Sequence, residues 1–192
     1  MVTKVGFSAL VLAVAGQRLW EVRKSRRHER ALRASGARES APEQMPVMKA
    51  VHGGWLLAML AEVWIGDRRF SPRLAAGALA TFGAGQVLRM LAMRQLGDRW
   101  TVKIMTLPDS PPIEEGVFRY LRHPNYLGVA LEMAALPMVH GAWMTALGFS
   151  MANGVLLHRR IAAEEAALDR DGDYEGAFAG RPRFIPRATT NR

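Results

Sequence analysis

Five apolar blocks, separated by charged segments, constrain most strongly what this chain of 192 residues can fold into. Nearly half of the residues (49%) are hydrophobic, yet the formal net charge is +9. A soluble amphipathic helix interleaves apolar and charged residues every three or four positions, whereas most charges here lie between the blocks. This separation is typical of membrane helices. The blocks span residues 5–20, 47–65, 74–93, 126–139 and 142–157.

The lengths of the blocks indicate how each one meets a bilayer. A helix needs about 20 apolar residues to cross the hydrocarbon core upright, and the first three blocks approach that length. The last two are shorter, and residues 137–141 join them into a tight helical hairpin that spans the membrane or dips into it. We therefore predict an all-α integral membrane bundle of about five transmembrane or re-entrant helices. A cytoplasmic amphipathic helix is predicted over residues 159–179.

The distribution of arginine and lysine predicts the orientation. Segment 18–49 is the richest in these residues, and short loops rich in Lys and Arg remain in the cytoplasm. The N-terminus is then outside, and segments 94–125 and 158–192 face the cytoplasm together at a bacterial plasma membrane. Basic residues at the ends of apolar blocks favour contact with anionic membrane lipids, and we do not expect nucleic-acid binding.

Ionisable residues inside the apolar blocks are the first candidates for chemistry. The chain has no cysteine, which excludes disulfides, thiolate metal sites and cysteine nucleophiles, and no metal site is predicted. A charged side chain facing lipid costs about 2.5–3.5 kcal/mol on insertion scales. Glu62 and Arg89 lie near block ends, where structural ion pairs are as expected as functional roles. Glu132 lies mid-block without a basic residue one turn away, so we expect it to face the interior or a cavity.

A polar segment at residues 122–128 precedes the fourth block. Pro124 suits the first turn of a helix, which places Arg122 and His123 at a helix N-terminus that favours an anionic group. Tyr126 adds an aromatic face and a hydroxyl group. The residues alone leave open whether this segment binds a ligand or anchors the helix end among lipid headgroups. The acidic pair Glu164-Glu165 is likewise either a favourable charge placement or a ligand for an amine or a ribose diol.

The order of these features resembles the isoprenylcysteine carboxyl methyltransferase and phospholipid methyltransferase superfamily. The resemblance covers roughly residues 86–187 and is closest to bacterial members that O-methylate phenolic or pyrone lipids. It is carried by Arg122-His123-Pro124-x-Tyr126-x-Gly128, a hydrophobic hairpin, Arg160-Ile161-x-x-Glu164-Glu165 and then Tyr174.

The resemblance implies a methyltransferase that uses S-adenosylmethionine and acts on a lipophilic small-molecule acceptor among membrane lipids. In this single domain, residues 1–93 would form N-terminal transmembrane helices and residues 94–192 the catalytic region. Arg122 and Arg160 would orient the acceptor or the methionine carboxylate, and Glu132 or His123 would act as a base toward a phenol. The residues implied to bind the cofactor are Gln86, His123, Tyr126, Leu127, Gly128, Glu164 and Glu165.

Three alternatives concern the reaction and the class of protein. The acceptor oxygen belongs either to a phenolic or pyrone lipid or to a carboxylate. N-methylation of a phospholipid amine is a second reaction type. A non-enzymatic membrane scaffold is a different class, in which Glu62, Arg89 and Glu132 would form structural ion pairs only. The oligomeric state is not indicated by the sequence.

Overall fold

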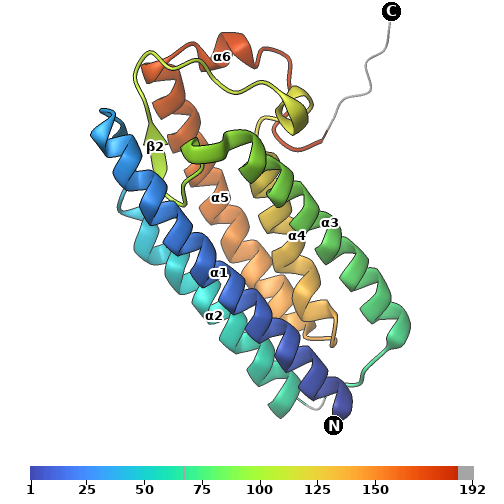
Figure 1. Cartoon of the computed structure of the whole chain (residues 1–192). Coiled ribbons are helices and arrows are strands. Elements are labelled where there is room, and N and C mark those ends of the chain that lie inside the picture. Colours follow the sequence, from blue (N-terminus) through green and yellow to red (C-terminus); the bar gives the residue numbers. More distant parts are fainter. Residues whose placement is uncertain (67, 186–192) are drawn as a thin grey trace, which may run out of the picture.

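The computed structural model describes residues 1–66 and 68–185, in which five long helices form an elongated bundle (Figure 1). The short elements gather at the end of the bundle opposite the N-terminus, which we call the loop end. The long helices are α1 (Val2–Ala34), α2 (Gln44–Ile65), α3 (Pro72–Leu96), α4 (Pro124–Met138) and α5 (Trp143–Asp171). The short elements are β1 (Arg38–Ser40), η1 (Gly97–Arg99), β2 (Ile104–Thr106), η2 (Gly116–Arg119) and α6 (Tyr174–Ala177).

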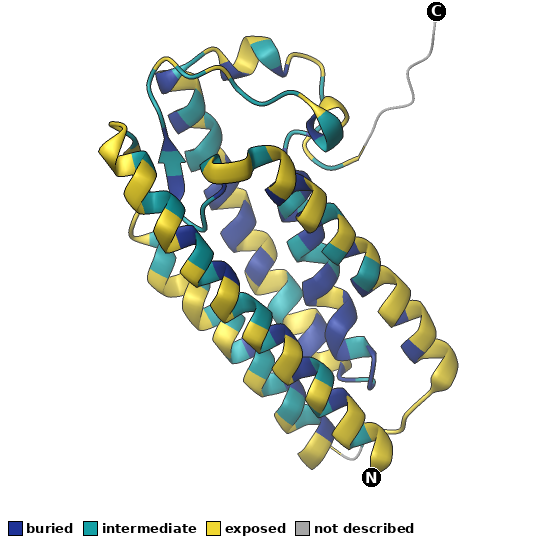
Figure 2. Cartoon of the chain, in the orientation of Figure 1, coloured by how far each residue is buried: buried dark blue, intermediate teal, exposed yellow. Residues whose placement is uncertain are grey.

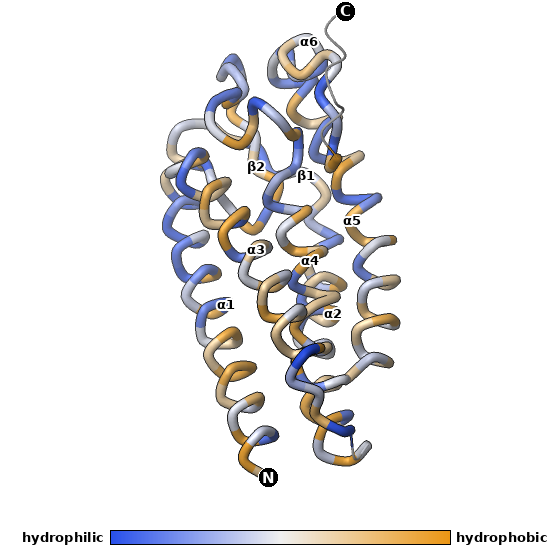
Figure 3. The backbone as a smooth tube through the Cα atoms, turned by 90° about the vertical axis from the view of Figure 1, so that its right-hand side faces the viewer, coloured by the Kyte–Doolittle hydropathy of each residue, from blue (hydrophilic) through white to orange (hydrophobic). Residues whose placement is uncertain are grey.

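Helix α1 extends well beyond the first apolar block. The block ends at Trp20, but the helix continues to Ala34, because the Arg, Glu, Lys, Leu and Ala residues that follow are strong helix formers. It ends before Gly36, whose φ of +88° is left-handed and suits glycine. The arginine-rich segment is therefore largely a helical extension, which gives α1 an apolar half and a hydrophilic half (Figure 3).

The prediction of a separate amphipathic helix over 159–179 is corrected by the structure. The fifth apolar block and the first part of that segment form one continuous helix, α5, of 29 residues. No glycine or proline interrupts the chain between Gly154 and Gly172, so nothing stops the helix there. The short helix α6 follows after Asp173, whose side chain accepts a hydrogen bond from the backbone N–H of Gly176.

A small sheet also departs from the all-α prediction. Strands β1 and β2 pair antiparallel, with Arg38 opposite Thr106 and Ser40 opposite Ile104. This pairing joins the link between α1 and α2 to the polar segment after α3. That segment is mostly irregular between η1 and α4.

The outward faces of the helices carry many apolar residues. Exposed residues run along the outer sides of the bundle (Figure 2), and they include Leu12, Leu57 and Leu79. In the described part of the chain, two helical segments, α1 and Pro72–Arg99, are long and apolar enough to cross a membrane. Only 22% and 28% of their apolar windows is buried inside the protein. The rest faces outward, where lipid accommodates apolar surface.

Helices α3 and α4 cross closely at two glycines. A Cβ atom on Gly128 would lie 2.5 Å from Cγ of Arg89 and 2.7 Å from the carbonyl oxygen of Gly85. A Cβ on Gly85 would lie 2.9 Å from the carbonyl oxygen of Gly128. Small residues permit this approach, and the crossing fixes the beginning of α4 against α3.

Glu62 caps α5 at the end of the bundle away from the loop end. Its carboxylate accepts hydrogen bonds from the backbone N–H of Met144 at 3.2 Å and of Thr145 at 2.7 Å. It also accepts one from the Thr145 hydroxyl at 2.7 Å and pairs with Arg68 at 2.9 Å. A carboxylate is favourable at a helix N-terminus, so Glu62 has a structural role that fixes α2 against α5.

Candidate active site

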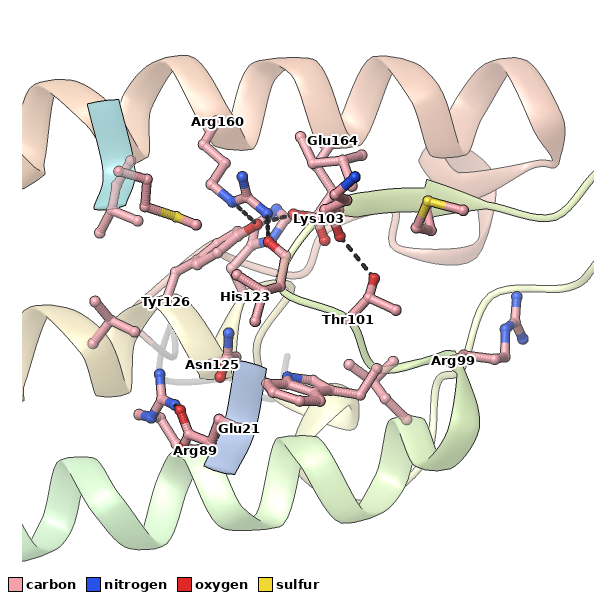
Figure 4. A pocket seen from close by; sticks show the side chains of 18 of the residues that line it. Glu21, Arg89, Arg99, Thr101, Lys103, His123, Asn125, Tyr126, Arg160 and Glu164 are labelled. Atoms are coloured by element: carbon pink, nitrogen blue, oxygen red, sulfur yellow. Dashed lines mark hydrogen bonds and ion pairs between the residues drawn. The ribbon is translucent and has the colours of Figure 1, made fainter. Parts of the chain in front are cut away.

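A cavity of about 490 Å³ lies within the bundle toward its loop end. Its volume falls in the range of about 300–1,000 Å³ that small-molecule sites occupy. All five long helices and the segment after α3 contribute to its wall. Figure 4 shows Arg160 and Glu164 entering from α5, with Arg89 on α3 at the opposite side. Five of the predicted catalytic and cofactor-binding residues line it, namely Arg122, His123, Tyr126, Arg160 and Glu164.

The start of α4 is held by the chain near residue 182. Pro124 occupies the first turn of α4, and His123 precedes it as the N-cap residue. The backbone N–H of Arg122 donates to the carbonyl of Pro182 at 3.0 Å, and that of His123 donates to Arg183 at 3.2 Å. Nε of Arg122 also donates to the carbonyl of Arg181 at 2.8 Å. These bonds position the motif that precedes α4.

Glu165 gathers three basic side chains at the edge of the cavity, and we call these four residues the Glu165 cluster. Its carboxylate lies 2.9 Å from Nε2 of His123, 2.5 Å from Nη2 of Arg183 and 4.0 Å from Nη1 of Arg122. Burial acts to raise the pKa of Glu165, but hydrogen bonds from His123 and Arg183 prevail and lower this pKa to about 2. Glu165 is therefore ionised at neutral pH and holds His123 in place.

Tyr126, Arg160 and Glu164 form a second group on the cavity wall. The Tyr126 hydroxyl donates to Oε2 of Glu164 and accepts a hydrogen bond from Nε of Arg160 at 2.9 Å (Figure 4). Arg160, which is 3% exposed, also donates to the carbonyl of Val102 in the segment after α3. The His123 ring stacks on Tyr126 with centroids 5.5 Å apart. One group thus connects α4, α5 and the loop.

Several predicted site residues lie outside the cavity lining, as far as the described residues define it. Gln86 exchanges hydrogen bonds with Gln17 on α1, the shorter at 2.8 Å. Gly128 lies at the crossing with α3, and Leu127 follows Tyr126 on α4. Glu165 stands behind His123. The cofactor-binding roles of these residues stay predictions, and the structure places them around the cavity rather than on its surface.

Glu132 belongs to a ring of charges that we call the buried quartet, together with the buried Glu21 and Arg89 and the partly buried Arg18. Arg18 pairs with Glu21 at 2.6 Å and with Glu132. Arg89 pairs with Glu21 at 2.6 Å and with Glu132 at 3.2 Å. Each cation therefore contacts each anion, and the quartet connects α1, α3 and α4. The basic partners that the sequence did not place near Glu132 come from other helices.

Sequence reasoning missed several residues of the cavity wall. Trp100 is buried on the segment after α3. Asn125 lies inside the recognised motif at a position that the motif leaves open. Its Oδ1 atom is buried and makes no hydrogen bond to the described residues, although buried polar atoms are nearly always paired. Asn125 lines the cavity, so this atom is suited to a ligand. The sequence feature that could have identified Asn125 is its place as a polar residue between two motif positions.

Comparison with known sequences gives relatives of two kinds. Residues 78–170 match the isoprenylcysteine carboxyl methyltransferase family. The uncharacterised protein YpbQ of Bacillus subtilis is 32% identical over 84% of this chain and 96% of its own length. An uncharacterised protein of Haemophilus influenzae is 30% identical over 83% of this chain and 91% of its own. The protein-S-isoprenylcysteine O-methyltransferase of Schizosaccharomyces pombe is 32% identical over 47% of this chain and 39% of its own length.

A solved structure shares the fold. The eukaryotic intramembrane Ras methyltransferase, an isoprenylcysteine carboxyl methyltransferase, superposes with a TM-score of 0.56 at 19% identity. The match covers 73% of this chain and 52% of the other, so this chain spans about half the length of that enzyme. With the apolar outer surface, the shared fold indicates an integral membrane protein. The chain belongs to the isoprenylcysteine carboxyl methyltransferase family.

Proposed function

We propose that this protein transfers a methyl group from S-adenosylmethionine to an oxygen atom of a lipophilic acceptor in the membrane. The acceptor oxygen belongs to a phenolic or pyrone lipid or to a carboxylate. The observation that carries the proposal is the convergence of His123, Tyr126, Arg160 and Glu164 on one cavity. Family membership supports the reaction type, since matched relatives are named as O-methyltransferases.

The polar groups of the cavity fit this cofactor. The described residues make one hydrogen bond to the Glu164 carboxylate, at Oε2, which leaves Oε1 for a ribose diol or an amino group. The unpaired Oδ1 of Asn125 can accept a hydrogen bond from an amino group. Trp100 and Tyr126 supply aromatic surfaces for a purine ring. When bound, S-adenosylmethionine supplies an electrophilic methyl group on a sulfonium sulfur.

The residues of this chain then act by placement. The Glu165 cluster and the bonds to residues 181–183 hold His123 and the start of α4 in fixed positions. Arg160 and Glu164 hold Tyr126 from α5. Holding two reactants in line accelerates a bimolecular reaction strongly. We propose that the loop end faces the cytoplasm, because the arginine-rich half of α1 lies there.

Binding of S-adenosylmethionine to the full chain in detergent tests the proposal. Equilibrium dialysis with the radiolabelled cofactor is expected to show saturable binding. Glu164→Ala should weaken it by about tenfold or more, because hydrogen bonds to charged groups contribute about 1.5–3 kcal/mol. The matched control is Glu115→Ala, which removes an exposed carboxylate and should leave binding unchanged. An intact protein that binds no cofactor would favour the scaffold.

The reaction itself is tested on lipid extracts. Membranes of cells with and without the protein are compared by mass spectrometry for a lipid that gains one CH₂ unit. The Glu164→Ala chain should produce less of this lipid, because it binds the cofactor more weakly. A methylated amine in place of a methylated oxygen would replace this proposal with N-methylation.

A further inference from the structure

The cavity extends past the cofactor-facing groups to a region between α2 and α5. His52 and Leu56 of α2 line this region, as do Asn153, Leu156 and Leu157 of α5. Except for His52 and Asn153 these side chains are apolar. Burying a polar side chain among apolar ones in a membrane bundle costs free energy, so such residues indicate a functional site. Neither was included among the predicted site residues.

The His52 ring has a defined tautomer. Its Nδ1 atom lies 2.9 Å from the backbone carbonyl of Met48, and a carbonyl oxygen only accepts hydrogen bonds. Nδ1 therefore carries the proton of that bond. In the neutral ring Nε2 then holds a lone pair. No described residue makes a hydrogen bond to Nε2, so this atom is available as a proton acceptor in the cavity wall.

Asn153 presents a second unsatisfied group. Its residue is 2% exposed, and its Oδ1 atom makes no hydrogen bond to the described residues. A buried amide without a partner is rare. Because Asn153 lines the cavity, a ligand is the available partner. The amide group offers both a donor and an acceptor.

The packing of α2 against α5 brings the two residues to the same level. The two helices run antiparallel, as shown by Glu62 bonding to Thr145 and by Gly54 packing against Phe149. Asn153 lies one turn after Phe149 on the same face of α5. One turn back from Gly54 along α2 reaches residues 50–51, adjacent to His52. This register places the imidazole and the amide at neighbouring depths, and both side chains line the cavity.

The charged groups around His52 leave it as the free base of this region. The guanidinium groups of Arg18 on α1, Arg89 on α3 and Arg160 on α5 act on its ring. Two further charged residues, Glu21 on α1 and Lys49 on α2, line the same cavity. Arg18 and Arg89 are balanced by the carboxylates of the buried quartet. Of the two bases expected from the sequence, Glu132 is held by both of these guanidinium groups, and Nε2 of His123 is engaged with Glu165. If Glu132 took the proton of the acceptor, its ion pairs with Arg18 and Arg89 would be lost. Nε2 of His52, in contrast, makes no hydrogen bond to the described residues.

We propose that His52 and Asn153 form the subsite for the acceptor, with His52 as proton acceptor and Asn153 as the group that positions the headgroup. This rests on the proposed function and narrows the acceptor to a lipid with a weakly acidic hydroxyl group. Nε2 of His52 takes the hydroxyl proton, and the oxygen forms its bond to the methyl carbon. The electron pair of the broken carbon–sulfur bond stays on sulfur, which leaves as a neutral thioether. A carboxylate acceptor would need no base.

An ionisable probe tests this without turnover. The probe is para-nitrophenol carrying an alkyl chain, whose phenolate form absorbs visible light. The full chain in detergent is titrated with it, and the pH of half-ionisation is compared with that in protein-free micelles. Bound to the intact protein, the probe should ionise about one pH unit lower, which is a tenfold change in its ionisation constant. Binding without any such displacement would overturn the proposal.

Variants identify the residue that displaces the pH of half-ionisation of the probe. His52→Gln should abolish the displacement, whereas His158→Gln, at an exposed position of α5, should retain it. Asn153→Leu should weaken binding of the probe about tenfold, because the amide that positions the headgroup is lost. A displacement that survives His52→Gln would assign the base elsewhere.

Cofactor binding separates a failure of the acceptor subsite from a failure of the proposed function. Each variant is also tested for S-adenosylmethionine binding, which His52→Gln and Asn153→Leu should retain and which shows that they are folded. An intact chain that binds the cofactor but leaves the probe unaffected would refute only the acceptor subsite. An intact chain that binds no cofactor would refute the proposed function.

Discussion

The buried quartet and the Glu165 cluster are built from the same kinds of side chain but are connected differently. In the quartet two arginines and two glutamates form all four cation–anion pairs. In the Glu165 cluster a single carboxylate serves three basic side chains. Every charged group of the closed ring is paired with groups of opposite charge. The open cluster has more basic groups than carboxylates, so it can still attract an anionic group of a ligand. The quartet therefore holds three helices together, whereas the cluster holds residues at the edge of the cavity.

Breaking the ring of charges should have the largest effect on stability. Arg89→Met leaves two buried carboxylates with one cation, and removing one member of a buried ion pair costs about 3–5 kcal/mol. Thermal unfolding of the purified chain measures this. The control is Arg94→Met, which removes an exposed arginine of the same helix. Equal losses in both variants would mean that the quartet holds nothing together.

Disturbing the quartet without removing a charge should have the next largest effect. Gly128→Ala places a methyl group against Arg89 and the backbone of Gly85, and overpacking of this kind costs about 1–3 kcal/mol. Gly77→Ala on α3 is the matched control. Its new Cβ meets nothing within 4 Å, so it should stabilise the helix by up to about 1 kcal/mol. If both substitutions change the free energy of unfolding equally, the close crossing of α3 and α4 does not restrict the residue at position 128 to glycine.

Neutralising the centre of the open cluster should affect binding more than stability. Glu165→Gln frees His123 and Arg183, and we expect the affinity for S-adenosylmethionine to fall about tenfold, or about 1.4 kcal/mol. The free energy of unfolding should change by less than about 1 kcal/mol, as for other ion pairs near solvent. A large loss of stability with unchanged cofactor affinity would reverse the roles assigned to the two groups.

The pH dependence of the open cluster gives the smallest and most specific effect. The pKa of Glu165 is lowered from 4.5 to about 2. A lowered pKa contributes stability that is complete above the unfolded value and is lost as the pH falls through the folded one. The stability difference between the intact chain and Glu165→Gln should therefore be constant above about pH 5 and shrink toward pH 2. Denaturant titrations at a series of pH values measure it.

The sequence predicted those parts of the site that lie on one motif or one helix turn. His123 and Tyr126 share the start of α4, and Glu164 and Glu165 share one turn of α5, so their spacing already described their local geometry. The hairpin between them implied that α4 and α5 are neighbours. This much required no knowledge of the remaining helices. The helical bundle followed from the same apolar blocks, although α1 and α5 proved longer than predicted.

The rest depends on contacts between distant segments. Glu132 has no basic residue one turn away, and its partners Arg18 and Arg89 come from two other helices. The pairing of β1 with β2 joins segments more than sixty residues apart. His52 and Asn153 are each ordinary polar residues in an apolar block, and only the packing of α2 on α5 gives them a common position. Helix periodicity alone does not specify such pairings.

The cap that Glu62 places on α5 has a consequence at the opposite end of the bundle. A helix is nearly incompressible along its axis and advances 1.5 Å per residue. Any slippage of α5 against α2 at Thr145 would therefore move Asn153, Arg160 and Glu164 together by the same amount. The carboxylate of Glu62 therefore sets the axial position of these three cavity-lining residues. A substitution of Glu62, at the opposite end of the bundle, would change the shape of the cavity.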